Sequence, residues 1–135
     1  MPRQTLNPDN VFNTLQYGFS QAVIVRGGRR MLLSGQVGVD ASERTVAGGL
    51  AAQVDAAFDN IGRILAEAGG DFRHVAMLRI YIVESVRREQ ECIVEALRAR
   101  FPQAPPATSW IIVSGLSEPE WLVEIEAEAV LPETA

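Results

Sequence analysis

The sequence predicts an α+β fold in which two helices lie on one face of a single β-sheet, in the order β-β-α-β-α-β-β. Three observations indicate this fold. Two long segments repeat apolar residues at helical spacing. Short runs rich in Val, Ile and Leu surround them, as is typical of strands. The last run alternates apolar and acidic residues, as a strand with one buried face does. With 135 residues, of which 47% are apolar, the chain is expected to form one domain over residues 1–135.

The N-terminal part predicts an arm followed by a β-hairpin. Residues 1–10 hold no period and are expected to form the arm. Residues 19–26 and 30–36 are apolar and rich in β-branched side chains, and Gly27-Gly28 lies between them. Because a glycine pair tolerates the positive φ angles of a tight hairpin turn, the two runs are expected to pair with each other.

Two amphipathic helices are expected. The first follows a loop over 37–49, covers residues 50–68 and ends at Gly69-Gly70. Its inward face contains Leu50, Val54, Ala57, Phe58, Ile61, Leu65 and Ala68, and its outward face Gln53, Asp59, Arg63 and Glu67. The second covers residues 86–100 and ends at Phe101-Pro102, because proline cannot continue a helix.

Three further strands are expected, at 75–83, 109–114 and 121–131. The first is apolar apart from Arg79, which is expected to form an ion pair with the glutamates of the last strand. In that last strand Glu124, Glu126 and Glu128 lie on one face and the apolar side chains on the other, so the three carboxylates form either a solvated surface or part of a site.

The topology leaves one face of the sheet without helices. Right-handed crossovers place both helices on the same face. The other face carries Leu122 and Val130 beside the glutamates, and the strands at 19–26 and 75–83 are apolar in both alternations. Because such a face is too apolar to stand alone in water, the sequence predicts that the protein forms an oligomer through it.

Composition excludes several function classes. The chain has 12 basic residues, all arginine, so no Schiff-base lysine and no phosphate-gripping Walker lysine exists. It has one histidine, His74, and one cysteine, Cys92, so no metal site and no cofactor is expected. A net charge of −5 argues against nucleic acid as a partner. The absence of a long apolar segment and of a signal-like start predicts a cytoplasmic protein with no membrane partner.

Several segments together resemble the Rid (YjgF/RidA) family. They begin with Gly18-Phe19-Ser20-Gln21-Ala22-Val23 and continue through Leu33-Ser34-Gly35-Gln36. The most specific is the family's C-terminal signature, which here reads Pro106-Ala107-Thr108-Ser109-Trp110-Ile111-Ile112-Val113-Ser114-Gly115-Leu116, followed six residues later by Val123-Glu124-Ile125. The resemblance covers nearly the whole chain. It implies a YjgF-like, chorismate-mutase-like fold, a homotrimer, and a small-molecule ligand in clefts between subunits.

One position departs from the signature. Where the deaminating members of the family have an arginine after Pro-Ala, this chain has Thr108. In those members the arginine is understood to hold the carboxylate of the substrate, which a guanidinium does with two charge-assisted hydrogen bonds. A threonine hydroxyl offers one neutral bond, which is weaker by about 1–3 kcal/mol. We therefore expect 2-iminobutanoate and 2-iminopropanoate to be poor substrates.

The resemblance also assigns candidate site residues. Glu124 matches the family glutamate beside the attacking water, and Ser34 supplies a nearby hydroxyl; these two are the catalytic candidates. The amide of Gly35 is a candidate donor to a substrate oxygen. Substrate-binding candidates complete the set: Phe19 at the family's tyrosine, Cys92 near an asparagine, Trp110 after the signature serine, Thr108, and Arg79. Ser34 could equally bond to backbone, Cys92 could be a small core residue, and Arg79 could replace the missing arginine.

Three functions stay open at this point. The first is a hydrolase of a small imine, enamine or related carbonyl compound that uses water positioned by Glu124. The second is a trimer without catalysis, which binds a small ligand for regulation or acts like a chaperone; Thr108 and Phe19 favour it. The third is an endoribonuclease, for which an acidic chain with one histidine offers little support.

Overall fold

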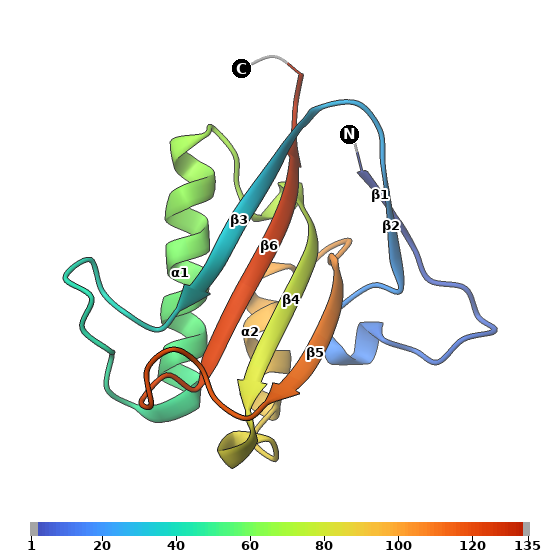
Figure 1. The fold of residues 1–135 in the computed structure, drawn as a ribbon. Helices are drawn as coiled ribbons and strands as arrows, with labels where there is room; N and C mark the ends of the chain where they lie inside the picture. The colour runs from blue at the N-terminus through green and yellow to red at the C-terminus, as the bar shows by residue number, and fades with distance from the viewer. Residues whose placement is uncertain (1–2, 134–135) are drawn as a thin grey trace.

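The structure, a computed structural model, describes residues 3–133, and a four-stranded sheet with two helices on one face forms its body (Figure 1). The strand order is β3-β6-β4-β5, and only β4 and β5 are parallel. The elements are β3 (Arg29–Val37), α1 (Gly49–Glu67), β4 (Val75–Val83), α2 (Glu91–Arg100), β5 (Ala107–Val113) and β6 (Val123–Leu131). The predicted α+β class with both helices on one face is confirmed.

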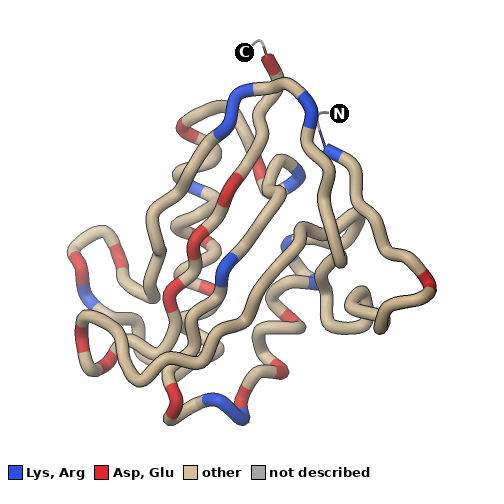
Figure 2. The backbone as a smooth tube through the Cα atoms, turned by 45° about the vertical axis from the view of Figure 1, so that its right-hand side comes forward, with Lys and Arg blue, Asp and Glu red and all other residues tan. Residues whose placement is uncertain are grey.

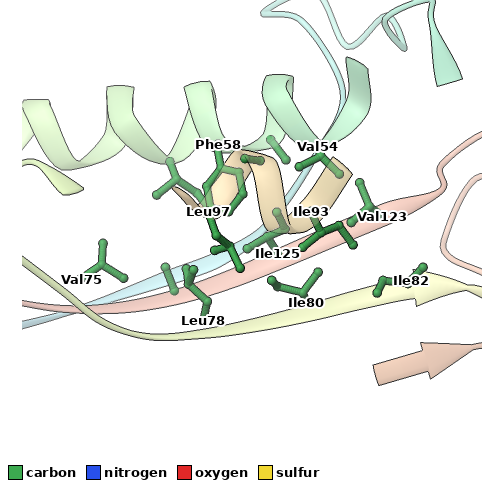
Figure 3. Packing of buried hydrophobic residues seen from close by; sticks show 14 of the residues in the cluster. Val54, Phe58, Val75, Leu78, Ile80, Ile82, Ile93, Leu97, Val123 and Ile125 are labelled. Carbon is green, nitrogen blue, oxygen red and sulfur yellow. The ribbon is translucent and has the colours of Figure 1, made fainter. Parts of the chain in front are cut away.

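The core lies between the two helices and the sheet (Figure 3). Every second residue of β4 and β6 is fully buried there, because alternate side chains of a strand point to the same face. The two helices contribute apolar stripes at helical spacing. The labelled core residues come from α1 (Val54, Phe58), α2 (Ile93, Leu97), β4 (Val75, Leu78, Ile80, Ile82) and β6 (Val123, Ile125).

The N-terminal region differs from the prediction. Residues 3–6 form a strand, β1 (Arg3–Leu6), which pairs antiparallel with β2 (Ala22–Val25). The expected hairpin between 19–26 and 30–36 is wrong, because β2 and β3 share no ladder and β1–β2 forms a sheet of its own. In Figure 1 the chain leaves β2, crosses a wide arch and enters β3 at the far side of the sheet. The predicted arm therefore becomes half of a two-stranded ribbon; its first two residues lie outside the described part.

Two smaller differences concern the helices. Gln53 is buried in α1 instead of facing outward, and its amide donates to the carbonyl of Glu120 (3.0 Å) and accepts from the amide of Leu122 (2.9 Å). The second helix begins at Glu91, five residues later than predicted. A 3-10 turn over Glu84–Val86 precedes it, and short-range backbone bonds there stop the α-helix from starting earlier. Within residues 3–133, no helix is long and apolar enough to cross a membrane.

Candidate functional site

The side of the four-stranded sheet without helices, which we call the open face, carries most of the polar side chains of the strands. Three carboxylates project from β6 at every second position, and Figure 2 shows them as an acidic row along that strand. On β4, Tyr81 lies opposite Glu124 and Arg79 lies opposite Glu126. Residues opposite each other in an antiparallel pair share a face, so all of these side chains meet on the open face.

Two of the three carboxylates are already bonded. Arg79 donates to Glu128 at 2.9 Å, so the predicted ion pair is present, and Arg30 lies 3.5 Å from the same carboxylate. The hydroxyl of Tyr81 donates to Glu126 at 2.7 Å. The bond to Glu128 raises the pKa of Arg79, and the bond to Glu126 raises the pKa of Tyr81. Arg79 therefore keeps its charge and Tyr81 keeps its proton at neutral pH.

Glu124 differs from its two neighbours. Among residues 3–133, no side chain or backbone group donates a hydrogen bond to its carboxylate, which lies half-buried against Gly35. A methyl group at position 35 would overlap a carboxylate oxygen of Glu124 and come within 2.7 Å of its Cγ and Cδ. This side chain can therefore keep its present position only while residue 35 is glycine. The carboxylate is free to accept a proton or to orient a water molecule.

A β-bulge in β3 places Gly35 there. The register of β3 against β6 shifts between Leu33 and Gln36, so that Ser34 and Gly35 together oppose the single residue Glu126. A bulge bends the strand locally and releases backbone groups from the ladder. Ser34 is exposed, and its carbonyl accepts a bond from the side chain of Gln36 (3.1 Å). The two β3 candidates and Glu124 thus lie together.

The remaining candidates lie on the helix side of the sheet, at the edge formed by β5; we call Phe19, Cys92, Thr108 and Trp110 the rim. Thr108 and Trp110 lie opposite Leu78 and Ile80 of β4, whose side chains enter the core. The indole of Trp110 donates to the hydroxyl of Thr108 at 2.9 Å, and its ring packs 5.8 Å from the ring of Phe19. The hydroxyl of Thr108, the residue expected where the signature has arginine, is thus already bonded within the same strand.

Cys92 contributes packing to the rim. It lies on α2, partly buried against the core, and its thiol donates to the carbonyl of Glu89 at 3.3 Å. Burial raises the pKa of this thiol above its ordinary value. It is therefore uncharged at neutral pH, which does not suit a nucleophile.

The sheet itself separates the predicted site residues of one chain into two groups. Ser34, Gly35 and Glu124 lie with Arg79 on the open-face side, and the rim lies across the sheet at its β5 edge. Sequence reasoning did not single out Tyr81; its only signal was its alternation with Ile80 and Ile82. Among residues 3–133, no group of three or more His, Cys, Asp or Glu side chains is placed to hold a metal ion.

Comparisons with known proteins point to one family. The family profile described as endoribonuclease L-PSP matches residues 13–131. The 2-iminobutanoate/2-iminopropanoate deaminase of Bos taurus is 35% identical over 113 residues, which cover 83% of this chain and 79% of the relative. A crystal structure of the Rid-family protein YyfB from Yersinia pestis is 35% identical, covers 97% of this chain and all of its own, and superposes with a TM-score of 0.92. RidA from an Antarctic Psychrobacter, 26% identical, covers 97% of this chain and 99% of its own, with a TM-score of 0.71.

Proposed function

The chain belongs to the Rid (YjgF) family, and on that premise we propose that it is a homotrimeric hydrolase of a small imine or enamine whose substrates need no carboxylate. The observation that carries the proposal is the carboxylate of Glu124. It is the one of three β6 carboxylates without a hydrogen-bond donor among residues 3–133, and it lies over a glycine that leaves space beside it. A carboxylate in this state is suited to handling a water molecule.

The proposed reaction uses water alone. Glu124 accepts a proton from a water molecule while the water oxygen bonds to the imine carbon, and the electron pair of the C=N bond moves to nitrogen, which takes up a proton. The carbinolamine nitrogen takes up a second proton, and the C–N bond then breaks with its electron pair on the departing ammonia. The hydroxyl proton is released, which balances the proton taken up, and the carbonyl product remains. An enamine enters the same sequence after protonation at carbon. The amide of Gly35 is the proposed donor to a substrate oxygen.

A site between subunits follows from the separation of the two groups. Within one chain the sheet lies between Glu124 and the rim, so no small molecule can contact both. A neighbouring copy that presents its rim to the open face would complete the site. The Rid resemblance supplies the expected number of three copies. Exposed apolar side chains such as Leu32 (67% exposed) give this face a physical reason to assemble.

The rim favours substrates without a carboxylate. Thr108 has no charge, and Trp110 already donates to its hydroxyl. Arg79 is the alternative clamp, but its guanidinium bonds to Glu128 on the other side of the sheet. Neither residue offers a free cation to a carboxylate. We further propose that the protein works without metal or cofactor and in the cytoplasm, where one unpaired cysteine suits a reducing compartment.

Ammonia release from a panel of imines tests the proposal. The panel pairs amino-acid-derived imines with their neutral and ester analogues, and the protein is assayed beside Glu124→Gln and Glu126→Gln. Activity on neutral analogues that disappears in Glu124→Gln and survives in Glu126→Gln is expected. The second variant is a matched control, since an amide can still accept the bond from Tyr81. If no imine of the panel released ammonia, the proposal of a hydrolase would be overturned.

One observation favours a second function, a trimer that binds a small ligand without catalysis. The rim is closed by the Trp110–Thr108 bond and the Phe19–Trp110 contact, which makes it apolar and lacking in charge. Native mass spectrometry of the purified trimer would detect a retained ligand, and such a ligand together with a silent imine panel would support this function. The endoribonuclease named in the family description finds less support, because the open face of this acidic chain carries an acidic row where phosphates would need cations.

A further inference from the structure

Among the four edge strands of residues 3–133 (β1, β2, β3 and β5), β2 and β3 each leave an outer edge without a partner strand. Among residues 3–133, β2 pairs only with β1, and β3 pairs only with β6. The outer edge of each strand therefore has backbone groups that no neighbouring strand bonds. An unpaired edge is a template for another strand, and proteins usually protect it with charges or proline.

Neither edge carries such protection along its central part. Ala22, Val23, Ile24 and Val25 of β2 are all uncharged, and Ile24 and Val25 are 40% and 44% exposed. Residues 31–37 of β3 contain no charged residue and no proline, and Leu32 is 67% exposed. These are also the two segments whose pattern predicts that they pair with each other. Their chemistry is complementary, yet they lie on opposite sides of the sheet (Figure 1).

Contacts within the chain hold the two edges apart. At the corner between them, the amide of Gly28 donates to the carboxylate of Glu133 at 2.7 Å, and Gly27 and Gly28 both have positive φ angles (54° and 75°). At the same end of the ribbon, where Arg3 lies opposite Val25, Arg3 donates to the carbonyls of Arg73 and Ala104, each at 2.7 Å. This end of the ribbon is thus anchored on both strands, so β2 does not fold back onto β3 of its own chain.

The comparison structures indicate that this placement is shared by part of the family. Residues 3–25 make up about a sixth of the chain, which is more than a TM-score of 0.92 at 97% coverage allows to be displaced. A TM-score of this size is what a Yersinia pestis protein with its ribbon in the same place would give. The RidA from Psychrobacter superposes with a TM-score of 0.71 at the same coverage of this chain.

We propose that in the assembled protein β2 of one copy pairs antiparallel with β3 of a second copy, so that the ribbons are exchanged between subunits. An exchanged element makes, between chains, the contacts that it would otherwise make within one chain. The register is then that of the hairpin the sequence predicts, with Val23 opposite Leu32 and Val25 opposite Arg30. Each exchange covers the free edges of β2 and β3. This inference does not depend on the catalytic proposal.

Engineered disulfides test the exchange. In a Cys92→Ser background, the double variant Val23→Cys with Leu32→Cys is purified, oxidised and separated on a non-reducing denaturing gel. Exchange predicts chains covalently linked to one another, and more than half of the protein should run as linked dimers or larger species. A disulfide within a monomer would mean a closed hairpin in one chain and would overturn the proposal. The double variant Val25→Cys with Arg30→Cys is tested in the same way. Free thiols in both double variants would also overturn the proposal.

A mixing experiment with single variants distinguishes strand exchange from disulfides that form in random collisions between molecules. Val23→Cys and Leu32→Cys chains, one of them carrying a size tag, are unfolded together, refolded and oxidised. Exchange predicts that the mixed disulfide exceeds either disulfide between identical chains by about tenfold. A statistical mixture of the three species, in which the mixed disulfide is no more abundant than the two disulfides between identical chains together, would mean random contact and would also overturn the proposal.

Discussion

The open face and the rim both carry candidate site residues, but only the open face keeps a free reactive group. On the open face Glu124 lies uncommitted over Gly35, beside two carboxylates that are bonded. At the rim, the hydroxyl of Thr108 and the ring of Trp110 bond to each other and leave no charge. Under the proposed function, this difference means that the carboxylate that handles water is available, while the rim has no charge with which to select a carboxylate-bearing substrate.

The largest expected effect is the loss of the free carboxylate. Glu124→Gln should lower kcat at least about 100-fold, because general base catalysis contributes factors of this order. Glu126→Gln should change kcat less than about threefold, since its group bonds to Tyr81 and has no direct role. Steady-state ammonia release on the best panel substrate measures both. Equal losses in the two variants would remove the distinction between the carboxylates.

A second prediction displaces the same carboxylate without removing it. In Gly35→Ala the new methyl group overlaps Glu124, so its side chain must move, and kcat should fall about 10- to 100-fold. Gly115→Ala is the matched control, because a methyl group there meets no atom within 4 Å. Thermal unfolding of both variants separates a local displacement from a general loss of stability. A Gly35→Ala protein with unchanged kcat would contradict the role given to Glu124.

The third prediction restores the charge at the rim. Thr108→Arg should improve kcat/KM for a carboxylate-bearing imine, relative to its ester, by about tenfold, since a charge-assisted hydrogen bond contributes about 1.5–3 kcal/mol. Ala51→Arg adds the same charge at an exposed position of α1, outside both the rim and the open face, and should leave the ratio unchanged. An unchanged ratio in Thr108→Arg would show that the rim does not contact the substrate.

The smallest effect concerns the rim thiol. Because burial raises the pKa of Cys92, the thiolate that reacts with iodoacetamide is scarcer than in free cysteine at the same pH. Alkylation at pH 8 should be severalfold slower than for free cysteine, and its rate should still rise above pH 9. Mass spectrometry of timed samples measures the rate. If Cys92 were alkylated faster than free cysteine, the conclusion that its thiol is buried and uncharged would be wrong.

Much of this molecule can be read from its sequence, and the failures share a cause. The periods of α1, β4 and β6 predict these elements and their buried faces, because periodicity is local. The hairpin fails because Glu133 and the carbonyl of Ala104, more than 100 residues away in the chain, hold the ribbon elsewhere. The prediction that Gln53 faces outward fails for a similar reason, since its partners are backbone groups near β6 that no pattern in α1 reveals.

The placement of the candidate site residues could be predicted only as far as single strands reveal it. Alternation places three glutamates on one face of β6, and the family resemblance selects Glu124 among them. Which carboxylates are bonded depends on Arg79 and Tyr81 across the ladder, a matter of register that a single strand cannot reveal. The two-sided arrangement of open face and rim likewise needs the order of β6, β4 and β5 in the sheet.

The contact between Gly35 and Glu124 also limits how these two positions can change over time. A chain that keeps glutamate at 124 in its present position has no room for a side chain at 35, whereas a chain with a shorter residue at 124 gains that freedom. Substitutions at the two sites should therefore be inherited together and not one by one. In homologous chains, loss of the glycine would mark those that have also given up the glutamate, and with it the reaction.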